Sequence, residues 1–190
     1  MRELLIIFVK NPVLGKVKTR LAKDIGNEKA LEVYKKLLQH THDVTDSLSV
    51  TKRVYYSDVI DENDLWANDK FEKFQQSGAD LGERMHNAFQ QGFADGFDHI
   101  CIIGSDCFEI NSEIIEMAFS KLKTHDFVIG PAKDGGYYML GMKSLHKSLF
   151  ENKEWSTDKV LKETLTDIER LGKRFWKLAE LNDVDRVGDI

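Results

Sequence analysis

Three uninterrupted apolar stretches constrain the fold of this chain more than any other feature. They run from Leu4 to Val9, from Ile100 to Ile103 and from Phe127 to Ile129. A strand that faces solvent on one side alternates apolar and polar residues, whereas a continuous apolar run is typical of a strand that is covered on both faces. We therefore expect a sheet that lies between two layers of helices.

Segments with helical spacing separate these runs. Apolar residues recurring at helical intervals predict helices over residues 31–44, 81–93, 114–122 and 160–168. Shorter apolar stretches predict further strands over residues 54–56, 70–75, 137–140 and 175–176. Asn111 and Thr157 precede two of the helices and are residue types that commonly cap a helix N-terminus. Strands that alternate with helices indicate right-handed crossovers and a largely parallel sheet.

The length and composition fit one domain over residues 1–190, because no linker or internal repeat divides the chain. The formal net charge is −5, with acidic and basic residues interspersed, which argues against a general nucleic-acid-binding protein. The first apolar run is too short to span a membrane, and no small-residue cleavage site follows it. We therefore expect no membrane span and a cytoplasmic location.

Ligands of open parallel sheets bind outside the carboxyl ends of the strands, so the loops that follow the strands are the places to search. The loop after the first apolar run begins at Lys10 and contains Gly15, Lys18 and Arg20. Gly15 allows the backbone to approach a ligand closely, and the cationic side chains suit phosphate oxygens. A solvated basic loop would explain the same residues without a ligand.

The loop after the second apolar run contains Ser105 and Asp106. A carboxylate at the mouth of a buried strand can hold Mg²⁺ or Mn²⁺ and bridge it to a diphosphate. An aspartate that only caps a turn fits this fragment equally well. Near the end of the chain, Asp183 and Asp185 offer a second carboxylate that would complete a metal site with Asp106.

The third loop separates two apolar runs with Asp134-Gly135-Gly136, a sequence that is typical of a hairpin turn. The functional interpretation places Asp134 at the site, with the two glycines leaving room for a sugar or an acceptor. Tyr137 and Tyr138 follow, and adjacent strand residues point to opposite faces of a sheet. We therefore expect only one of the two, Tyr137, to line a pocket.

Other residues carry weaker signals. Gly82 is a poor helix former at a helix start and suggests that another group approaches closely, while Arg84 can meet either a phosphate or a surface acid. We expect Trp155 to be a buried indole beside a helix cap, with a pocket wall as the alternative. Cys101 and Cys107 are interpreted as small buried residues. The six histidines lack metal-ligand spacing and no nucleophile motif is present, which favours catalysis by positioning and electrostatics.

Taken together, ordered segments over nearly the whole chain resemble a known family. The matching residues are Phe8-Val9-Lys10, Pro12, Gly15, Lys18-Thr19-Arg20-Leu21, Leu81-Gly82-Glu83-Arg84-Met85, Ile103-Gly104-Ser105-Asp106-Cys107, Gly130 to Tyr138, Trp155-Ser156-Thr157 and Asp183-Val184-Asp185. They resemble the bacterial glycosyltransferase-like family of the GT-A (nucleotide-diphosphosugar transferase) fold, of the type associated with arsenosugar biosynthesis. The resemblance implies a three-layer α/β/α domain with a mostly parallel mixed sheet, a nucleotide-sugar donor, a small-molecule acceptor and Mg²⁺ or Mn²⁺.

The same resemblance assigns roles to individual residues. It implies catalytic roles for Asp106 and Asp134, with Asp134 as a candidate base, and metal coordination by Asp106 together with Asp183 or Asp185. The expected nucleotide- or substrate-binding residues are Lys10, Gly15, Lys18, Arg20, Arg84, Ser105, Gly135, Gly136 and Tyr137. The chain departs from the common Asp-x-Asp metal motif, because Ser105-Asp106-Cys107 offers a single acid.

Three functions remain open at this point. We favour a metal-assisted glycosyltransferase that transfers a sugar from a nucleotide sugar to a small-molecule acceptor. The alternative is a guanylyl- or cytidylyltransferase that uses a nucleoside triphosphate and a phosphorylated small molecule, because the first loop is also similar to that of phospholactate and molybdenum-cofactor guanylyltransferases. The single acid in the expected metal motif keeps a non-catalytic binding protein open as the third.

Overall fold

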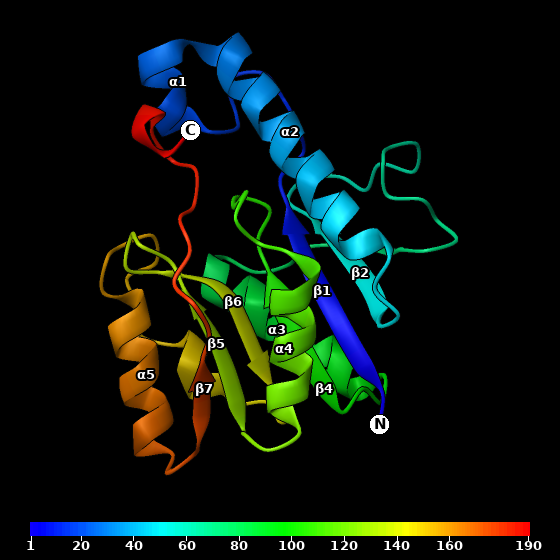
Figure 1. Cartoon of the computed structure of the whole chain (residues 1–190), viewed down its shortest axis with the longest axis vertical. Coiled ribbons are helices and arrows are strands. Elements are labelled where there is room, and N and C mark those ends of the chain that lie inside the picture. Colours follow the sequence, from blue (N-terminus) through cyan, green and yellow to red (C-terminus); the bar gives the residue numbers. More distant parts are fainter.

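The computed structural model describes all 190 residues, Met1–Ile190. Its centre is a seven-stranded sheet with the order β3-β2-β1-β4-β6-β5-β7 (Figure 1). The strands are β1 (Glu3–Val9), β2 (Thr51–Tyr56), β3 (Glu72–Gln75), β4 (His99–Ile103), β5 (Phe127–Pro131), β6 (Tyr137–Met142) and β7 (Phe175–Lys177). β6 runs antiparallel to both of its neighbours, and every other pairing is parallel. The predicted mixed, mostly parallel sheet is confirmed.

Helices cover both faces of this sheet. They are α1 (Thr19–Ile25), α2 (Asn27–Asp46), α3 (Leu81–Ala94), α4 (Ser112–Leu122) and α5 (Val160–Arg170), with 3₁₀ helices η1 (Lys147–Phe150) and η2 (Val187–Asp189). Buried side chains of α2 and α4 share one core with the sheet, and those of α3 and α5 share a second core on the opposite face. The three-layer α/β/α architecture that the resemblance implied is therefore confirmed.

The strand β1 shows why the apolar runs carry no polar alternation. Leu5 and Ile7 belong to the core beneath α2 and α4, whereas Leu4 and Ile6 belong to the core beneath α3 and α5. Each of these side chains is 0% exposed. Full burial of a side chain of this size stabilises a protein by about 1.5–3 kcal/mol. Both faces of the strand therefore require apolar residues.

The first two helices differ from the prediction. α2 begins at Asn27, earlier than expected, and a separate short helix precedes it. Gly26 lies between them with φ of 87°, a backbone conformation that other residues rarely adopt, so the chain changes direction there. At the sheet edge, β3 is shorter than predicted: Phe71 is buried but lies just before the strand begins.

The predicted helix caps are half right. The side chain of Asn111 accepts a hydrogen bond from the backbone N–H of Ile114 at 2.9 Å, as expected of the α4 cap. The prediction for Thr157 is wrong, because α5 begins at Val160. The hydroxyl of Thr157 instead donates to the carbonyl oxygen of Glu154 at 2.7 Å and stabilises the loop before the helix.

Distant segments of the chain meet at one edge of the sheet. β1 and β4 are parallel neighbours, so the loops that follow Val9 and Ile103 leave the sheet side by side. The last residues cross the same edge and end beside α1 (Figure 1). The backbone N–H of Val184 donates to the carbonyl oxygen of Asp106 at 2.8 Å. No helix has both the length and the apolar character needed to cross a membrane.

Candidate active site

A cavity of about 500 Å³ opens at this edge of the sheet. Small-molecule sites typically enclose about 300–1,000 Å³. The charged residues that line it are Lys10, Lys18, Arg20, Asp106, Asp134, Asp183 and Asp185. They come from the loops after β1 and β4, from the first turn of α1, from the turn between β5 and β6 and from the C-terminal segment. The structure thus brings together acids and bases that are far apart in the sequence.

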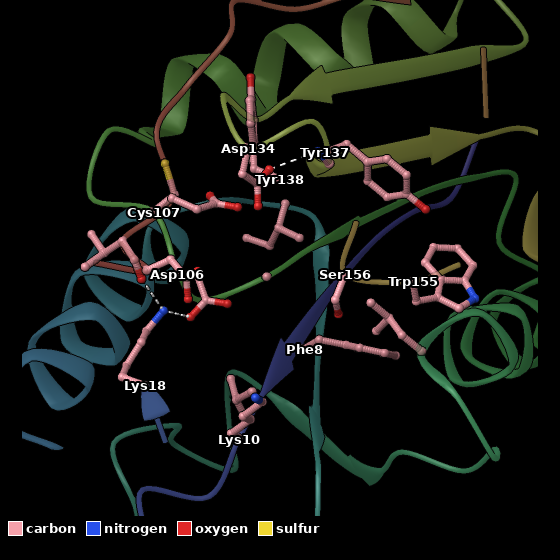
Figure 2. A pocket seen from close by; sticks show the side chains of 18 of the residues that line it. Phe8, Lys10, Lys18, Asp106, Cys107, Asp134, Tyr137, Tyr138, Trp155 and Ser156 are labelled. Atoms are coloured by element: carbon pink, nitrogen blue, oxygen red, sulfur yellow. Dashed lines mark hydrogen bonds and ion pairs between the residues drawn. The ribbon is translucent and has the colours of Figure 1, made fainter. Parts of the chain in front are cut away.

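Lys18 ties three of these segments together. Its φ of 49° lies in the left-handed region, which is uncommon for a residue other than glycine, and its side chain is only 8% exposed. Its ammonium group donates to the carboxylate of Asp106 and to the carbonyl oxygen of Val184 at 2.7 Å (Figure 2). An ammonium group can donate once more. Lys18 therefore fixes the floor of the cavity and retains one donor for a ligand.

Arg20, in the first turn of α1, forms a second link to the C-terminal segment. Its Nη1 donates to Oδ2 of Asp185 at 2.7 Å. The arginine side chain is 52% exposed and the aspartate side chain 38% exposed. Ion pairs as exposed as this one contribute little to stability. Arg20 can therefore exchange its carboxylate partner for a phosphate at small cost.

Asp183 is the acidic residue whose environment departs most from water. Burial raises the pKa of Asp183 to about 7, and the negative charges of Asp106 and Asp134 add to the effect, while Lys18 opposes it. A carboxyl group near half-protonation at neutral pH is sensitive to any cation that binds beside it. Carboxyl groups perturbed in this way are frequent at functional sites.

The charges of the cavity do not favour an anionic ligand by themselves. Four aspartates line it against three cations, Lys10, Lys18 and Arg20, and two of those cations already pair with aspartates. A diphosphate therefore needs further positive charge. No three histidine, cysteine or acidic side chains form a ready-made metal cluster. Asp106 and Asp183 fit Mg²⁺ or Mn²⁺ nevertheless, because such an ion often takes only one or two carboxylates from the protein and the rest from phosphates and water.

Asp134 closes the turn between β5 and β6 at the cavity rim. Its Oδ1 accepts a hydrogen bond from the backbone N–H of Gly136 at 2.9 Å, which holds the side chain in place. The neighbouring Gly135 does not line the cavity, contrary to the sequence-based prediction. Its φ is 91°, and a Cβ at this position would overlap the backbone of Asp158. The space that this glycine leaves is filled by protein.

Tyr34 of α2 supports the charged side of the cavity and carried no functional signal in the sequence. Its side chain is buried, and its hydroxyl accepts a hydrogen bond from the backbone N–H of Lys10 at 2.7 Å. The same hydroxyl lies 3.1 Å from Oγ of Ser105. Burial, and then the charge of Asp106, raise the pKa of Tyr34, which stays neutral. Ser105, predicted to bind a ligand, is 3% exposed and faces this tyrosine instead of the cavity.

Two other predicted ligand contacts also lie outside the cavity lining. The guanidinium of Arg84 donates to the carbonyl oxygen of Gly78 at 3.2 Å and to Oε1 of Gln76 at 3.3 Å. Arg84 therefore orients Gln76, which does line the cavity and which the sequence analysis missed. Gly15 has φ of 76° and forms a turn next to the side chain of Asn27, so it shapes the loop after β1.

Both tyrosines of β6 line the cavity, which corrects the expectation that only one would. They do point to opposite faces: Tyr138 belongs to the core beneath α2 and α4, and Tyr137 packs against the core beneath α3 and α5. The cavity extends around the end of the sheet, so it reaches both faces. The hydroxyl of Tyr138 donates to the carbonyl oxygen of Ala179 at 2.9 Å, so its proton is not available to a ligand.

Cys101 and Cys107 are both buried, as predicted. Cys107 also lines the cavity. Burial raises the pKa of its thiol to about 11. Because the thiolate is the nucleophilic form, Cys107 serves as an apolar wall of the cavity.

The fold, with a cavity at its strand ends, is that of the nucleotide-diphosphosugar transferase-like α/β proteins. Residues 39–157 match the family described as "Uncharacterized protein conserved in bacteria (DUF2064)". The chain belongs to this family. None of the curated proteins matches it.

Solved structures give the same picture. A protein from Desulfovibrio desulfuricans G20, provisionally named a nucleotide-diphospho-sugar transferase, is 33% identical with a TM-score of 0.89; the match covers 98% of this chain and 84% of that one. CMP:2-keto-3-deoxy-manno-octonic acid synthetase, solved with CTP, is 8% identical with a TM-score of 0.61 over 99% of this chain and 95% of that one. Glucosyl-3-phosphoglycerate synthase from Mycobacterium tuberculosis, solved with Mn²⁺, UDP-glucose and phosphoglyceric acid, is 11% identical with a TM-score of 0.58 over 96% of this chain and 70% of that one. The last two likenesses concern the fold alone.

Proposed function

We propose that residues 1–190 form one catalytic domain that transfers a sugar from a nucleotide sugar to a small-molecule acceptor, with Mg²⁺ or Mn²⁺ as cofactor. The observation that carries this proposal is the convergence of Lys18, Arg20, Asp106 and Asp183 in one cavity at the strand ends. The likeness to the D. desulfuricans protein, with its nucleotide-diphospho-sugar transferase name, supports the same class. The link to arsenosugar biosynthesis stays a prediction.

The donor diphosphate would lie against the loop after β1. Lys18 has one donor left after Asp106 and Val184, and Arg20 is exposed enough to turn from Asp185 to a phosphate. Lys10 is exposed at the mouth of the cavity and adds a third cation. Arginine and lysine are the side chains that best match phosphate oxygens.

Asp106 and Asp183 would hold the divalent ion between the protein and the diphosphate. The ion, when bound, supplies positive charge that stabilises the leaving nucleoside diphosphate. Its charge would also offset both the burial of Asp183 and the repulsion from Asp106 and Asp134, which together raise the pKa of Asp183 to about 7. Asp183, from the C-terminal segment, would thereby supply the second carboxylate that the motif around Asp106 lacks.

Asp134 is the candidate base. An acceptor hydroxyl would form a bond to the anomeric carbon of the sugar as the bond from that carbon to the diphosphate oxygen breaks, and the electron pair leaves with the nucleoside diphosphate. Oδ1 of Asp134 already accepts from Gly136, so its free Oδ2 would take the acceptor proton. A positioned carboxylate of this kind typically contributes about 10²–10⁴-fold to a rate.

A nucleotidyltransferase is the second candidate, because the sheet of this chain shares its fold with the CTP-bound synthetase. The same cations would then bind a nucleoside triphosphate. The attacking phosphate oxygen would form a bond to the α-phosphorus, and pyrophosphate would leave with the electrons of the broken bond. The identity of the leaving group therefore separates the two candidates.

Thermal unfolding with a panel of UDP-, GDP-, CDP- and ADP-sugars and nucleoside triphosphates, with and without Mn²⁺, tests the proposal. A ligand at a hundredfold excess over its dissociation constant stabilises the folded state by about 2.7 kcal/mol. We expect a nucleotide sugar to stabilise the protein only with Mn²⁺, and Asp106→Asn to remove this effect. Asp43→Asn is the matched control, since Asp43 lies on α2 with a side chain that is 62% exposed.

Product analysis decides between the candidates. Release of a nucleoside diphosphate from the stabilising nucleotide sugar supports the glycosyltransferase. Release of pyrophosphate from a triphosphate supports the nucleotidyltransferase instead. Binding without turnover of any nucleotide would support the non-catalytic protein, and a panel in which no nucleotide stabilises the fold would overturn the proposal.

A further inference from the structure

The cavity has two chemically different ends. Lys18 and Asp106 face each other on one side, and Phe8, Tyr137 and Trp155 lie on the other (Figure 2). Met85 of α3, whose sulfur lies 3.8 Å from the Tyr137 hydroxyl, belongs to the second side, which we call the apolar end. A diphosphate suits only the charged end, so the apolar end must face a different part of the bound molecules.

Few polar groups at the apolar end are free to bind a ligand. The hydroxyl of Tyr137 has only the sulfur of Met85 as a partner, at 3.8 Å, and sulfur is a weak acceptor. Gln76 is occupied: its Nε2 donates to the carbonyl oxygens of Val9 at 3.1 Å and Tyr55 at 2.9 Å. The donors at this end without a strong protein acceptor are therefore the hydroxyls of Tyr137 and Ser156 and the indole N–H of Trp155.

This shortage of partners argues against a sugar at the apolar end. A hexose would bury several hydroxyl groups there, and each buried hydroxyl without a partner costs about 1–3 kcal/mol. An apolar ring or alkyl body loses nothing in the same place and gains from the removal of its surface from water. The lining therefore favours a molecule with one polar group and an apolar body.

Trp155 is held in place as a wall of this end. Its indole lies directly against Gly82 of α3, where a Cβ would approach the Trp155 Cε2 and the carbonyl oxygen of Phe150 to 2.6 Å each. The next residue, Ser156, has φ of 64°, a conformation that is rare for a residue other than glycine. A glycine and a left-handed serine thus fix the edge of an aromatic surface beside the cavity.

We propose that the second substrate carries an aromatic or other apolar body, which lies against Trp155, Phe8 and Tyr137, and a hydroxyl group outside the apolar end, within reach of Asp134. Its role as the acceptor rests on the proposed glycosyl transfer. Binding of such a body to the apolar end does not, since it depends only on the lining of the cavity.

Ligand-observed NMR titrations with 4-nitrophenol, cyclohexanol and glucose test this inference. We expect both apolar probes to bind at least about tenfold more tightly than glucose, since one aromatic contact contributes about 0.5–1.5 kcal/mol and 1.4 kcal/mol is a factor of ten. Trp155→Ala should weaken 4-nitrophenol about tenfold. Trp176→Ala is the matched control, because Trp176 lies on β7 away from the cavity and is 37% exposed.

A conservative variant keeps the test informative if Trp155→Ala perturbs the fold. Trp155→Phe keeps an aromatic ring at this position and should retain most of the binding. Glucose binding as tightly as the phenol, or equal phenol affinities of wild type, Trp155→Phe and a folded Trp155→Ala, would overturn the inference. If the phenol binds as expected and no nucleotide binds with Mn²⁺, the apolar end stands and the glycosyltransferase proposal fails.

Discussion

Replacing Asp183 with asparagine should stabilise the metal-free protein relative to wild type, and this difference should grow as the pH rises from 5 to 8. The folded chain keeps the Asp183 proton up to a pKa of about 7, because the group is buried near Asp106 and Asp134. The unfolded chain releases this proton near the ordinary value of 3.8. Since the folded pKa is the higher one, the stability that the protonated group provides is complete below pH 4 and is lost as the pH rises through 7.

The size of the effect follows from the width of that window. Between pH 5 and pH 7 the folded state holds up to one proton more than the unfolded state, and this excess falls to about half a proton at pH 7. The free energy of unfolding therefore falls by at most about 1.4 kcal/mol per pH unit in this range. Because Asp183 keeps part of its surface exposed, solvent screening reduces the sum, and we expect about 2 kcal/mol. Asparagine cannot ionise and is close in shape to a protonated aspartate. The free energy of unfolding of the variant should therefore not fall in this way as the pH rises.

Urea unfolding followed by circular dichroism, in EDTA at pH 5, 6, 7 and 8, measures the difference. The curves of wild type and Asp183→Asn should diverge by about 2 kcal/mol toward pH 8. Asp43→Asn is the control, because Asp43 lies on α2, outside the cavity, with a side chain that is 62% exposed. Parallel pH dependences of wild type and Asp183→Asn would refute the reasoning, because Asp183 would then titrate like an exposed carboxyl group.

Three further predictions concern two residues of the cavity and the cap of helix α4. Lys18→Met should lower the free energy of unfolding by only about 1 kcal/mol, because the half-exposed Asp106 can regain water. The same variant should abolish nucleotide-dependent stabilisation, whereas the control Lys16→Met should show neither effect. Retained nucleotide binding in Lys18→Met would exclude the phosphate role of Lys18. Asn111→Ala should cost about 1 kcal/mol in urea unfolding through loss of the α4 cap, and an unchanged midpoint would show that the cap contributes nothing. Cys107, with a thiol pKa of about 11, should react with iodoacetamide at pH 7.5 only after unfolding; mass spectrometry of the folded protein would reveal the opposite.

The fold was predictable where its elements depend on residues that are close together in the sequence. The uninterrupted run of β1 requires burial on both faces, and Asn111 caps a helix through a partner three positions away. The helix α1 and the first turn of α2 were missed because the helical spacing of apolar residues was followed only from Leu31 onward. Thr157 was assigned to a cap on its residue type, although the helix that follows starts at Val160.

The candidate site was predictable to the extent that loops after parallel strands share one edge. That rule identified the loops of Lys18 and Asp106. It could not tell that the two side chains pair with each other, because the choice of a partner 88 positions away depends on how the loops pack. The wall of Trp155 against Gly82 was foreseen only as a close approach of some group, since nothing local to either residue names the other.

The hydrogen bond between Lys18 and Val184 determines when the pocket can form during synthesis of the chain. The two residues are 166 positions apart, and one of the two hydrogen bonds of the Lys18 ammonium belongs to the later one. A ribosome adds about 5–20 residues per second, so the 166 residues that separate Lys18 from Val184 take about 8–33 s to synthesise. A chain interrupted before Asp183 would therefore carry the sheet without a finished pocket, and ligand-dependent protection from proteolysis would begin only once the final residues have left the exit tunnel.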